Sequence, residues 1–236
     1  MRKIISPLRN IGLPIIIGSS GLLSMSLIAY LLQNETLSSF AISPHKIVNL
    51  TFTMQMLVLP ISLVALLFMY LYERKSFKTF FRLTSSTSSQ KSNWNSYGPM
   101  VLISFTLGNI LLMSFGVASQ NGLINKQFFS LLPLVLFFSV TNAWSEEIFS
   151  RFVIVAGLHG KIKPVTICWI SGIIFGIPHF FGTPSGFFGV ITSGLLGWLL
   201  AKSVIETKSL GWALLIHFLQ DVVIFGAGAM IIAGQH

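Results

Sequence analysis

The middle of the chain reads Trp144-Ser145-Glu146-Glu147-Ile148-Phe149-Ser150-Arg151. The flanking residues 128–138 and 152–156 are almost entirely apolar, although the whole chain has only six acidic residues. An ionised carboxylate inside hydrocarbon is costly unless it is paired or loses its charge. The segment therefore predicts a membrane helix that places acidic groups in apolar surroundings.

One of the two glutamates has a partner on its own helix. Glu147 and Arg151 are four residues apart, so they lie on one helical face and can form an ion pair. Glu146 points about 100° away from Glu147 around the helix and is free to face something else. The spacing predicts one carboxylate held by its own arginine and one available for chemistry. The alternative is a cluster of charges at a helix end on the membrane surface.

The composition is that of an integral membrane protein. Of the 236 residues, 53% are hydrophobic and 9% are charged, and the mean hydropathy is +0.80. A soluble domain has about 25% charged residues. The net charge of +9 does not indicate nucleic-acid binding, because the basic residues lie between apolar runs, where they fix membrane orientation. The single cysteine, Cys168, excludes an intramolecular disulfide and a multi-cysteine metal site.

Seven apolar stretches are long enough, at about 20 residues, to cross a bilayer. They are residues 11–32, 47–72, 98–118, 128–158, 164–181, 185–204 and 210–233. We therefore expect an all-α, polytopic membrane helix bundle with about seven transmembrane helices, which forms a single integral membrane domain over residues 1–236.

The distribution of positive charge predicts the orientation of this bundle. With a cytoplasmic N-terminus, the inside segments hold twelve of the fifteen Lys and Arg residues, and the outside segments hold two. The longest inside segment is a basic cytoplasmic loop over residues 73–97. Its phenylalanines at 77, 80 and 81 suggest an interfacial helix on anionic lipid, with a solvated basic loop as the alternative.

Six ionisable residues remain inside the predicted spans, where such groups are rare and by default functional. They are Glu146, Glu147, Arg151, His179, His217 and Asp221, on the fourth, fifth and seventh spans. Taken singly, each could be a helix–helix hydrogen-bonding residue worth about 1 kcal/mol. Taken together, three polar helix faces with no other polar partner in reach predict one common, hydrated cavity.

The residues next to these side chains in the sequence indicate how the side chains are arranged. His179 follows Pro178, which cannot donate a backbone hydrogen bond, so the helix is expected to bend or open beside the imidazole. His217 and Asp221 are four residues apart and share one helical face. A carboxylate and an imidazole on separate helices can polarise a water molecule by general base action. A second imidazole with a carboxyl neighbour can stabilise a tetrahedral oxyanion.

That set of groups fits peptide-bond hydrolysis without a covalent intermediate. The sequence has no serine nucleophile elbow, no His-Glu-x-x-His helix and no glycine-rich phosphate loop.

With these residues assembled, the sequence resembles the CPBP family, the CAAX proteases and bacteriocin-processing enzymes, also called the Abi family. Its motifs are Glu-Glu-x-x-x-Arg, Phe-x-x-x-His and His-x-x-x-Asn or Asp, which occur here at residues 146–151, 175–179 and 217–221. The resemblance covers roughly residues 131–229. It implies a catalytic core over residues 128–236, preceded in residues 1–127 by three less diagnostic spans and the basic loop.

The resemblance implies an intramembrane endopeptidase of the glutamate type in which Glu146 activates the attacking water with help from His179. His217 and Asp221 would then form the oxyanion site. The type II CAAX prenyl proteases of the family have Asn where this chain has Asp221, and Asp donates a hydrogen bond only when protonated. Asp221 would instead orient His217. The aspartate also points toward the bacterial branch of the family, hence to a bacterial plasma membrane.

The remaining motif residues have supporting roles in this resemblance. Glu147 and Arg151 would support and orient the catalytic helix, and Phe175 would pack beside it. The implied substrate is a membrane-associated peptide or protein within the lipid bilayer, with no nucleic-acid partner. In the bacterial branch this suggests peptide or bacteriocin processing, or immunity.

Two other functions are compatible with the same residues. Glu146, His179 and His217 would make a two-His-one-carboxylate set for Zn²⁺ in a metalloprotease, although we favour a mechanism without a cofactor. The protein could also be a non-enzymatic membrane partner or regulator that uses the basic segment 74–91.

Overall fold

The computed structural model describes residues 2–84 and 93–235, and the side chains of these residues except 2–9 and 95. No β-strand occurs in the described residues, so the predicted all-α class is confirmed. In chain order the elements are α1 (Arg2–Gln33), α2 (Lys46–Tyr72), α3 (Arg74–Phe80), α4 (Trp94–Ser119), α5 (Lys126–Glu147), the π-helix η1 (Ile148–Val153), α6 (Ile154–Leu158), α7 (Pro164–Gly176), the 3₁₀-helix η2 (Ile177–Phe180), α8 (Gly186–Thr207) and α9 (Gly211–Ala233).

Six helical segments of the described chain are long and apolar enough to cross a membrane. They correspond to the first, second, third, fourth, sixth and seventh predicted spans, and the fourth is the continuous run α5–η1–α6. The fifth predicted span is a shorter apolar helix, Pro164–Phe180, made of α7 and η2. At about 1.5 Å per residue it is slightly shorter than a bilayer core of about 30 Å. The total of seven crossings stays a prediction.

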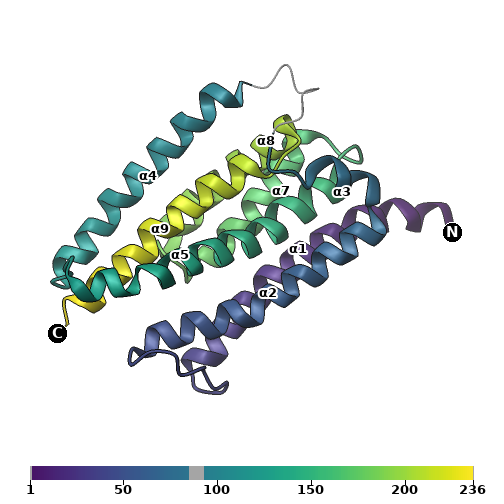
Figure 1. The fold of residues 1–236 in the computed structure, drawn as a ribbon. Helices are drawn as coiled ribbons and strands as arrows, with labels where there is room; N and C mark the ends of the chain where they lie inside the picture. Colours follow the sequence, from purple (N-terminus) through teal and green to yellow (C-terminus); the bar gives the residue numbers. More distant parts are fainter. Residues whose placement is uncertain (1, 85–92, 236) are drawn as a thin grey trace.

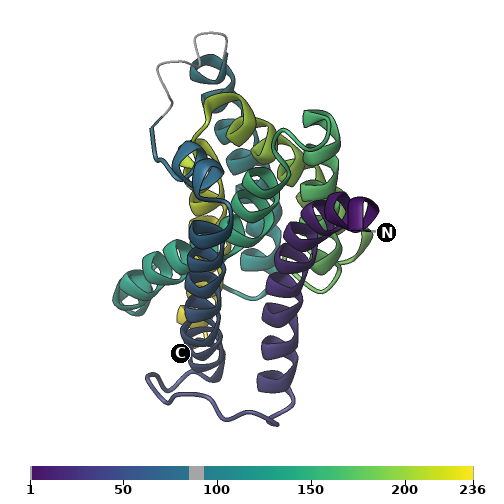
Figure 2. The same cartoon turned by 90° about the vertical axis from the view of Figure 1, so that its right-hand side faces the viewer.

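The helices form an elongated bundle with α5, α7 and α9 in its middle (Figure 1). α1 and α2 run side by side along one flank and are joined by a loop at their far ends (Figure 2). α4 lies at the opposite edge of the bundle (Figure 1), where its neighbours within the described chain are chiefly α9 and also α8. The beginning of α1 and the end of α9 lie at opposite ends of the bundle.

The core is centred on the π-helix η1, all six residues of which are buried. α3 packs against this region. Its Phe80 is fully buried, and the rings of Phe77 and Phe81 contact Phe152 of η1 at centroid distances of 5.3 and 5.4 Å. Phe80 therefore belongs to the core rather than to a lipid-facing surface, Phe77 and Phe81 are half-buried against it, and the position of α3 on anionic lipid stays a prediction. Residues 85–92 of the predicted basic loop, including Lys91, lie outside the described residues.

Two glycines allow α7 and α8 to pack with their backbones in contact. A Cβ atom on Gly172 would lie 2.7 Å from the carbonyl oxygen of Gly194, and one on Gly176 would lie 2.6 Å from the carbonyl oxygen of Val190. Small residues four apart let membrane helices approach closely, because their attraction there is mostly van der Waals packing. This contact fixes the helix that carries Phe175 and, beyond it, His179.

Substitution of Gly176 by Ala should lower the stability of the bundle by about 1–3 kcal/mol, because the new Cβ would press on backbone that cannot give way. Thermal unfolding of the purified protein in detergent measures the effect. The matched control is Gly116→Ala in α4, where a Cβ meets nothing within 4 Å. That change should be neutral or slightly stabilising, because alanine favours helix by about 1 kcal/mol over glycine. Equal unfolding midpoints for the two variants would contradict the close contact.

On the side of the bundle that carries α3, the loop after α6 and the loop after α8 meet over one phenyl ring. The Nε2 of His159 lies 3.4 Å from the Nζ of Lys208. The imidazole centroid is 4.9 Å from that of Phe80, and the ammonium lies 4.9 Å from the same ring. Burial, and then the charge of Lys208, lower the pKa of His159 from its ordinary value of 6.5. Burial also lowers the pKa of Lys208.

This arrangement predicts a pH dependence of stability. Because the folded protein binds a proton at His159 less readily than the unfolded chain does, the contribution of His159 to stability should fall as the pH drops through about 6.5. His159→Phe should therefore lose less stability than the wild type between pH 7.5 and 5.5. Thermal unfolding of both proteins at the two pH values measures this difference, since the other histidines titrate in both. Parallel pH profiles would show that His159 is not the responsible group.

Candidate active site

The helix geometry changes directly after the acidic pair. α5 ends at Glu147 and continues as η1, and π-turns within α-helices often occur at functional sites. The hydroxyl of Ser150 donates to the carbonyl oxygen of Glu146 and accepts a hydrogen bond from Nη1 of Arg151. Ser171 of α7 donates to the carbonyl oxygen of Ser150 at 2.6 Å. These contacts hold the widened turn, and with it the two glutamates, against α7.

Arg151 is completely buried and forms the predicted ion pair. Its Nη2 lies 2.9 Å from Oε1 of Glu147, and both side chains are 0% exposed. The guanidinium carbon lies 3.8 Å from the centroid of the Phe175 ring, so a cation–π contact adds to the pair. Phe175 therefore packs beside the helical segment that carries Arg151, as predicted.

His217 of α9 is bound by Glu147. The Nδ1 of the imidazole lies 2.7 Å from Oε1 of Glu147, and since a carboxylate can only accept, Nδ1–H is the donor. The other ring nitrogen, Nε2, lies 3.6 Å from Oε2 of Glu146 and 3.7 Å from Oδ2 of Asp221. Glu147 therefore connects Arg151 to His217 in addition to supporting its own helix. The motif pattern alone does not reveal this link.

Two uncharged residues join the site that the sequence motifs do not contain. The Nδ2 of Asn142 lies 3.2 Å from Oε1 of Glu146 and 3.2 Å from Oδ2 of Asp221. Gln55 of α2 donates its Nε2 to Oδ1 of Asn142 at 3.1 Å. The spacing of four between Asn142 and Glu146 places both on one helical face, which is the signal that could have identified Asn142. No signal in the sequence connects Gln55 to the site.

His179 lies where α7 tightens into the 3₁₀ turn η2, next to Pro178. Its Nδ1–H donates to the carbonyl oxygen of Phe175 at 2.8 Å, and the two rings are 4.6 Å apart between centroids. This bond leaves Nε2 of His179 available for another partner. Of the two imidazoles, that of His217 is within ion-pair distance of Glu146.

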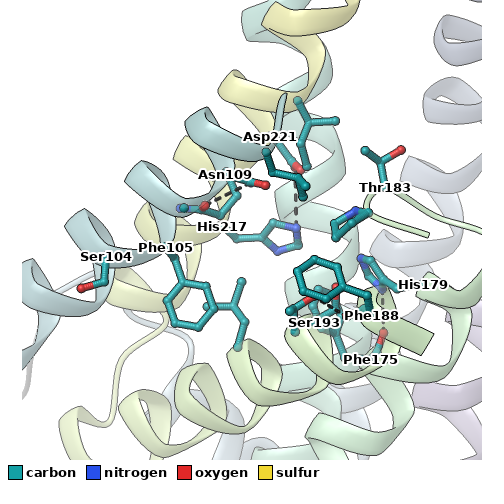
Figure 3. Close-up of a pocket in the computed structure, with 17 residues that line it drawn as sticks. Ser104, Phe105, Asn109, Phe175, His179, Thr183, Phe188, Ser193, His217 and Asp221 are labelled. Atoms are coloured by element: carbon teal, nitrogen blue, oxygen red, sulfur yellow. Dashed lines mark hydrogen bonds and ion pairs between the residues drawn. The ribbon is translucent and has the colours of Figure 1, made fainter. Parts of the chain in front are cut away.

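A cavity of about 300 Å³ lies between α4, α8, α9 and the turn that follows α7. His179, His217 and Asp221 all line it, as does Phe175 (Figure 3). The other lining residues are divided between apolar side chains, such as Phe105 and Leu196, and uncharged polar ones, such as Asn109 and Thr192. Glu146 is not among the lining residues, but its side chain is 15% exposed and its Oε2 faces His217. The predicted convergence on one cavity is therefore found for the helices that carry His179 and for α9, whereas no residue of α5 or η1 lines the cavity and Glu146 is adjacent to it through His217.

The structure offers no support for the predicted zinc alternative. Among residues 2–84 and 93–235, no three His, Cys, Asp or Glu side chains come together as a group that could hold a metal ion. Nδ1 of both His179 and His217 is bound within the protein, which leaves Nε2 of each as the nitrogen that could ligate a metal. The reaction proposed below uses no metal, because the described residues contain no such group of ligands.

The buried charges predict a large loss of stability when one partner is removed. Glu147→Gln should destabilise the protein by about 3–5 kcal/mol, because the Arg151 guanidinium would be left without its counter-charge. The double variant Glu147→Gln with Arg151→Met should recover much of this loss, since no unpaired charge remains. Thermal unfolding in detergent measures both variants. A double variant less stable than Glu147→Gln alone would contradict the pairing.

A family model described as Type II CAAX prenyl endopeptidase Rce1-like matches residues 128–223 of the chain. No curated protein and no solved structure matches it. The matched segment begins in α5 and ends in α9, so it contains all six ionisable residues of the site. Together with the six apolar helices, the match supports an integral membrane endopeptidase of the CAAX type. Residues 128–223 are thus similar to the Rce1-like type II CAAX prenyl endopeptidases, and the resemblance of the sequence to the CPBP family is confirmed.

Proposed function

We propose that the protein is an intramembrane endopeptidase of the glutamate type, which hydrolyses a peptide bond of a membrane-associated peptide or protein. One observation carries the proposal: Oε2 of Glu146 lies 3.6 Å from Nε2 of His217, while His217 is fixed by Glu147 and lines a cavity that His179 also lines. A general base, an oxyanion donor and a space for the substrate are therefore adjacent.

In the proposed reaction, Glu146 takes a proton from a water molecule as the oxygen attacks the carbonyl carbon of the substrate. Oε2 of Glu146 suits this role because it is buried and makes no hydrogen bond to the described protein atoms. His179 assists by placing the water or the substrate carbonyl with its available Nε2. The protonated Glu146 then donates the proton to the leaving amine, which gives a carboxylic acid and an amine as products.

His217 stabilises the oxyanion of the tetrahedral intermediate in this mechanism. Because Nδ1–H is donated to Glu147, a donor at Nε2 requires the doubly protonated imidazolium. The charges around it suit that form, since carboxylate oxygens of Glu146, Glu147 and Asp221 lie within 3.7 Å of the ring nitrogens of His217, while Arg151 is paired with Glu147. Asp221 contributes its charge beside Nε2 rather than a direct hydrogen bond, because 3.7 Å exceeds hydrogen-bond length.

The proposed substrates are membrane-associated peptides or proteins of the kind that CAAX proteases cleave. The assay below compares a prenylated with an unprenylated peptide. The matched family is described as type II CAAX prenyl endopeptidase. In the resemblance set out above, Asp221 stands where type II CAAX prenyl proteases have Asn. We propose a bacterial plasma membrane as the setting and peptide or bacteriocin processing, or immunity, as the role, on the strength of this aspartate. The proposal includes no cofactor.

Glu146→Gln and His179→Ala should each lower cleavage by about 1,000-fold or more, because each removes a group that acts on the attacking water. The purified protein in lipid vesicles is assayed with two fluorescence-quenched CAAX-type peptides, one with a farnesylated cysteine and one without. Cleavage sites are then read by mass spectrometry. Ser139→Ala is the control, since this buried hydroxyl bonds only within α5, to the carbonyl oxygen of Val135. It should retain wild-type activity.

Three outcomes separate the alternatives. Retained cleavage in both Glu146→Gln and His179→Ala would refute the assignment. Activity that is lost with a chelator and restored by zinc would favour the metalloprotease. Full cellular function of the Glu146→Gln variant would favour a non-enzymatic membrane partner.

A further inference from the structure

Two buried carboxamides lie in the membrane interior outside the motifs, on helices α2 and α5. Gln55 is 0% exposed and Asn142 is 9% exposed. An amide in an apolar environment is costly without hydrogen-bond partners, so buried amides are normally bonded. Here the two amides bond to each other and Asn142 bonds to two carboxylates of the proposed site, while Oε1 of Gln55 makes no hydrogen bond to the described protein atoms.

Asn142 divides its two amide hydrogens between two acids. A carboxamide nitrogen carries two N–H donors, and Nδ2 of Asn142 is 3.2 Å from Oε1 of Glu146 and 3.2 Å from Oδ2 of Asp221. With Oε1 bound, Oε2 of Glu146 is the oxygen that faces Nε2 of His217, 3.6 Å away. One hydrogen bond thus selects which carboxylate oxygen of Glu146 is presented for reaction.

Gln55 and the two carboxylates together fix which way the amide of Asn142 points. The Nε2–H of Gln55 donates to Oδ1 of Asn142, so the acceptor end of that amide faces α2 and the donor end faces the acids. The opposite orientation would set an acceptor against two carboxylates and a donor against a donor. The pair therefore has one favourable arrangement.

The two hydrogen bonds of Asn142 also reduce the repulsion between the carboxylates of Glu146 and Asp221. Arg151 is paired with Glu147, and the ion-pair partner of both Glu146 and Asp221 in the described chain is the single imidazole of His217. Like charges in a medium of low dielectric constant repel strongly. A shared donor between Glu146 and Asp221 offsets this repulsion and keeps both carboxylates almost equally distant from Nε2 of His217, at 3.6 and 3.7 Å.

We propose that Asn142, oriented by Gln55, is a positioning residue that sets Glu146 and Asp221 relative to His217 by donating one amide hydrogen to each. The inference rests on the proposed endopeptidase function and adds α2 to the elements that build the site. Asn142 does not touch the substrate in this role, so its effect is expected on turnover rather than on substrate binding.

The test measures kcat and KM on the two quenched peptides in vesicles, farnesylated and not. Asn142→Leu removes both donors at similar size and should lower kcat by about 10- to 100-fold with KM within about 3-fold, the range expected for hydrogen bonds to charged groups. Gln55→Leu removes only the orienting bond and should lower kcat less. Ser139→Ala on the same face of α5 is the control that should keep wild-type kcat.

A compensating pair separates positioning from packing. Asn142→Asp has the shape of Asn but adds a carboxylate beside those of Glu146 and Asp221, so it should be more damaging than Asn142→Leu. Combining it with Asp221→Asn restores one donor and the original charge and should recover part of kcat. Packing alone predicts equal loss for Asn142→Asp and Asn142→Leu, and no recovery in the pair.

The outcomes distinguish this inference from the function on which it rests. A wild-type protein that cleaves neither peptide, or cleavage that survives Glu146→Gln, overturns the proposed function and this inference with it. Cleavage that requires Glu146 but keeps its full kcat in Asn142→Leu, or a loss confined to KM, overturns the role of Asn142 alone.

Discussion

The completely buried ion pair between Glu147 and Arg151 constrains the rest of the structure. Two charges far from water are stable only when each is paired and hydrogen-bonded, and loss of either partner leaves a costly isolated charge. The surroundings supply Ser150 on Nη1, the Phe175 ring beside the guanidinium, and His217 on the same carboxylate oxygen, while Nε of Arg151 and Oε2 of Glu147 make no hydrogen bond to the described protein atoms. Since these groups come from three helical segments, satisfying one charge pair brings the helices of the site together.

The same requirement extends to the neutral polar groups. From the carboxylates the hydrogen bonds continue through Asn142 to Gln55 on α2, a helix that contains none of the motif residues. In water such amides could be satisfied by solvent, whereas within apolar helices they must find partners in the protein. The polar interior is therefore a connected network from α2 to α9, surrounded by side chains suited to lipid.

The sequence was informative where the physics is local. Helix extents follow from apolar runs, and the pair Glu147–Arg151 follows from a spacing of four. The contacts of His217 with Glu147 depend on how α5 and α9 are packed, which no spacing reveals. Neutral amides are ordinary in membrane helices, so the residue types of Asn142 and Gln55 alone do not indicate that they belong to the site. The sequence suggests a lipid-facing position for Phe80, whereas the structure places it in the core. A phenylalanine between basic residues gives the same sequence pattern in either position.

The cavity and the reactive groups are coupled through α9. Gln220 donates to Thr106 Oγ1 at 3.0 Å and accepts from Asn109 at 3.2 Å, so the wall formed by α4 is attached beside Asp221. One turn earlier, His217 is fixed from the other side by Glu147. A shift of α4 along α9 would therefore strain bonds to the residue next to Asp221. These two hydrogen bonds, with the packing of α4 on α9, therefore hold the register between the substrate space and the carboxylates.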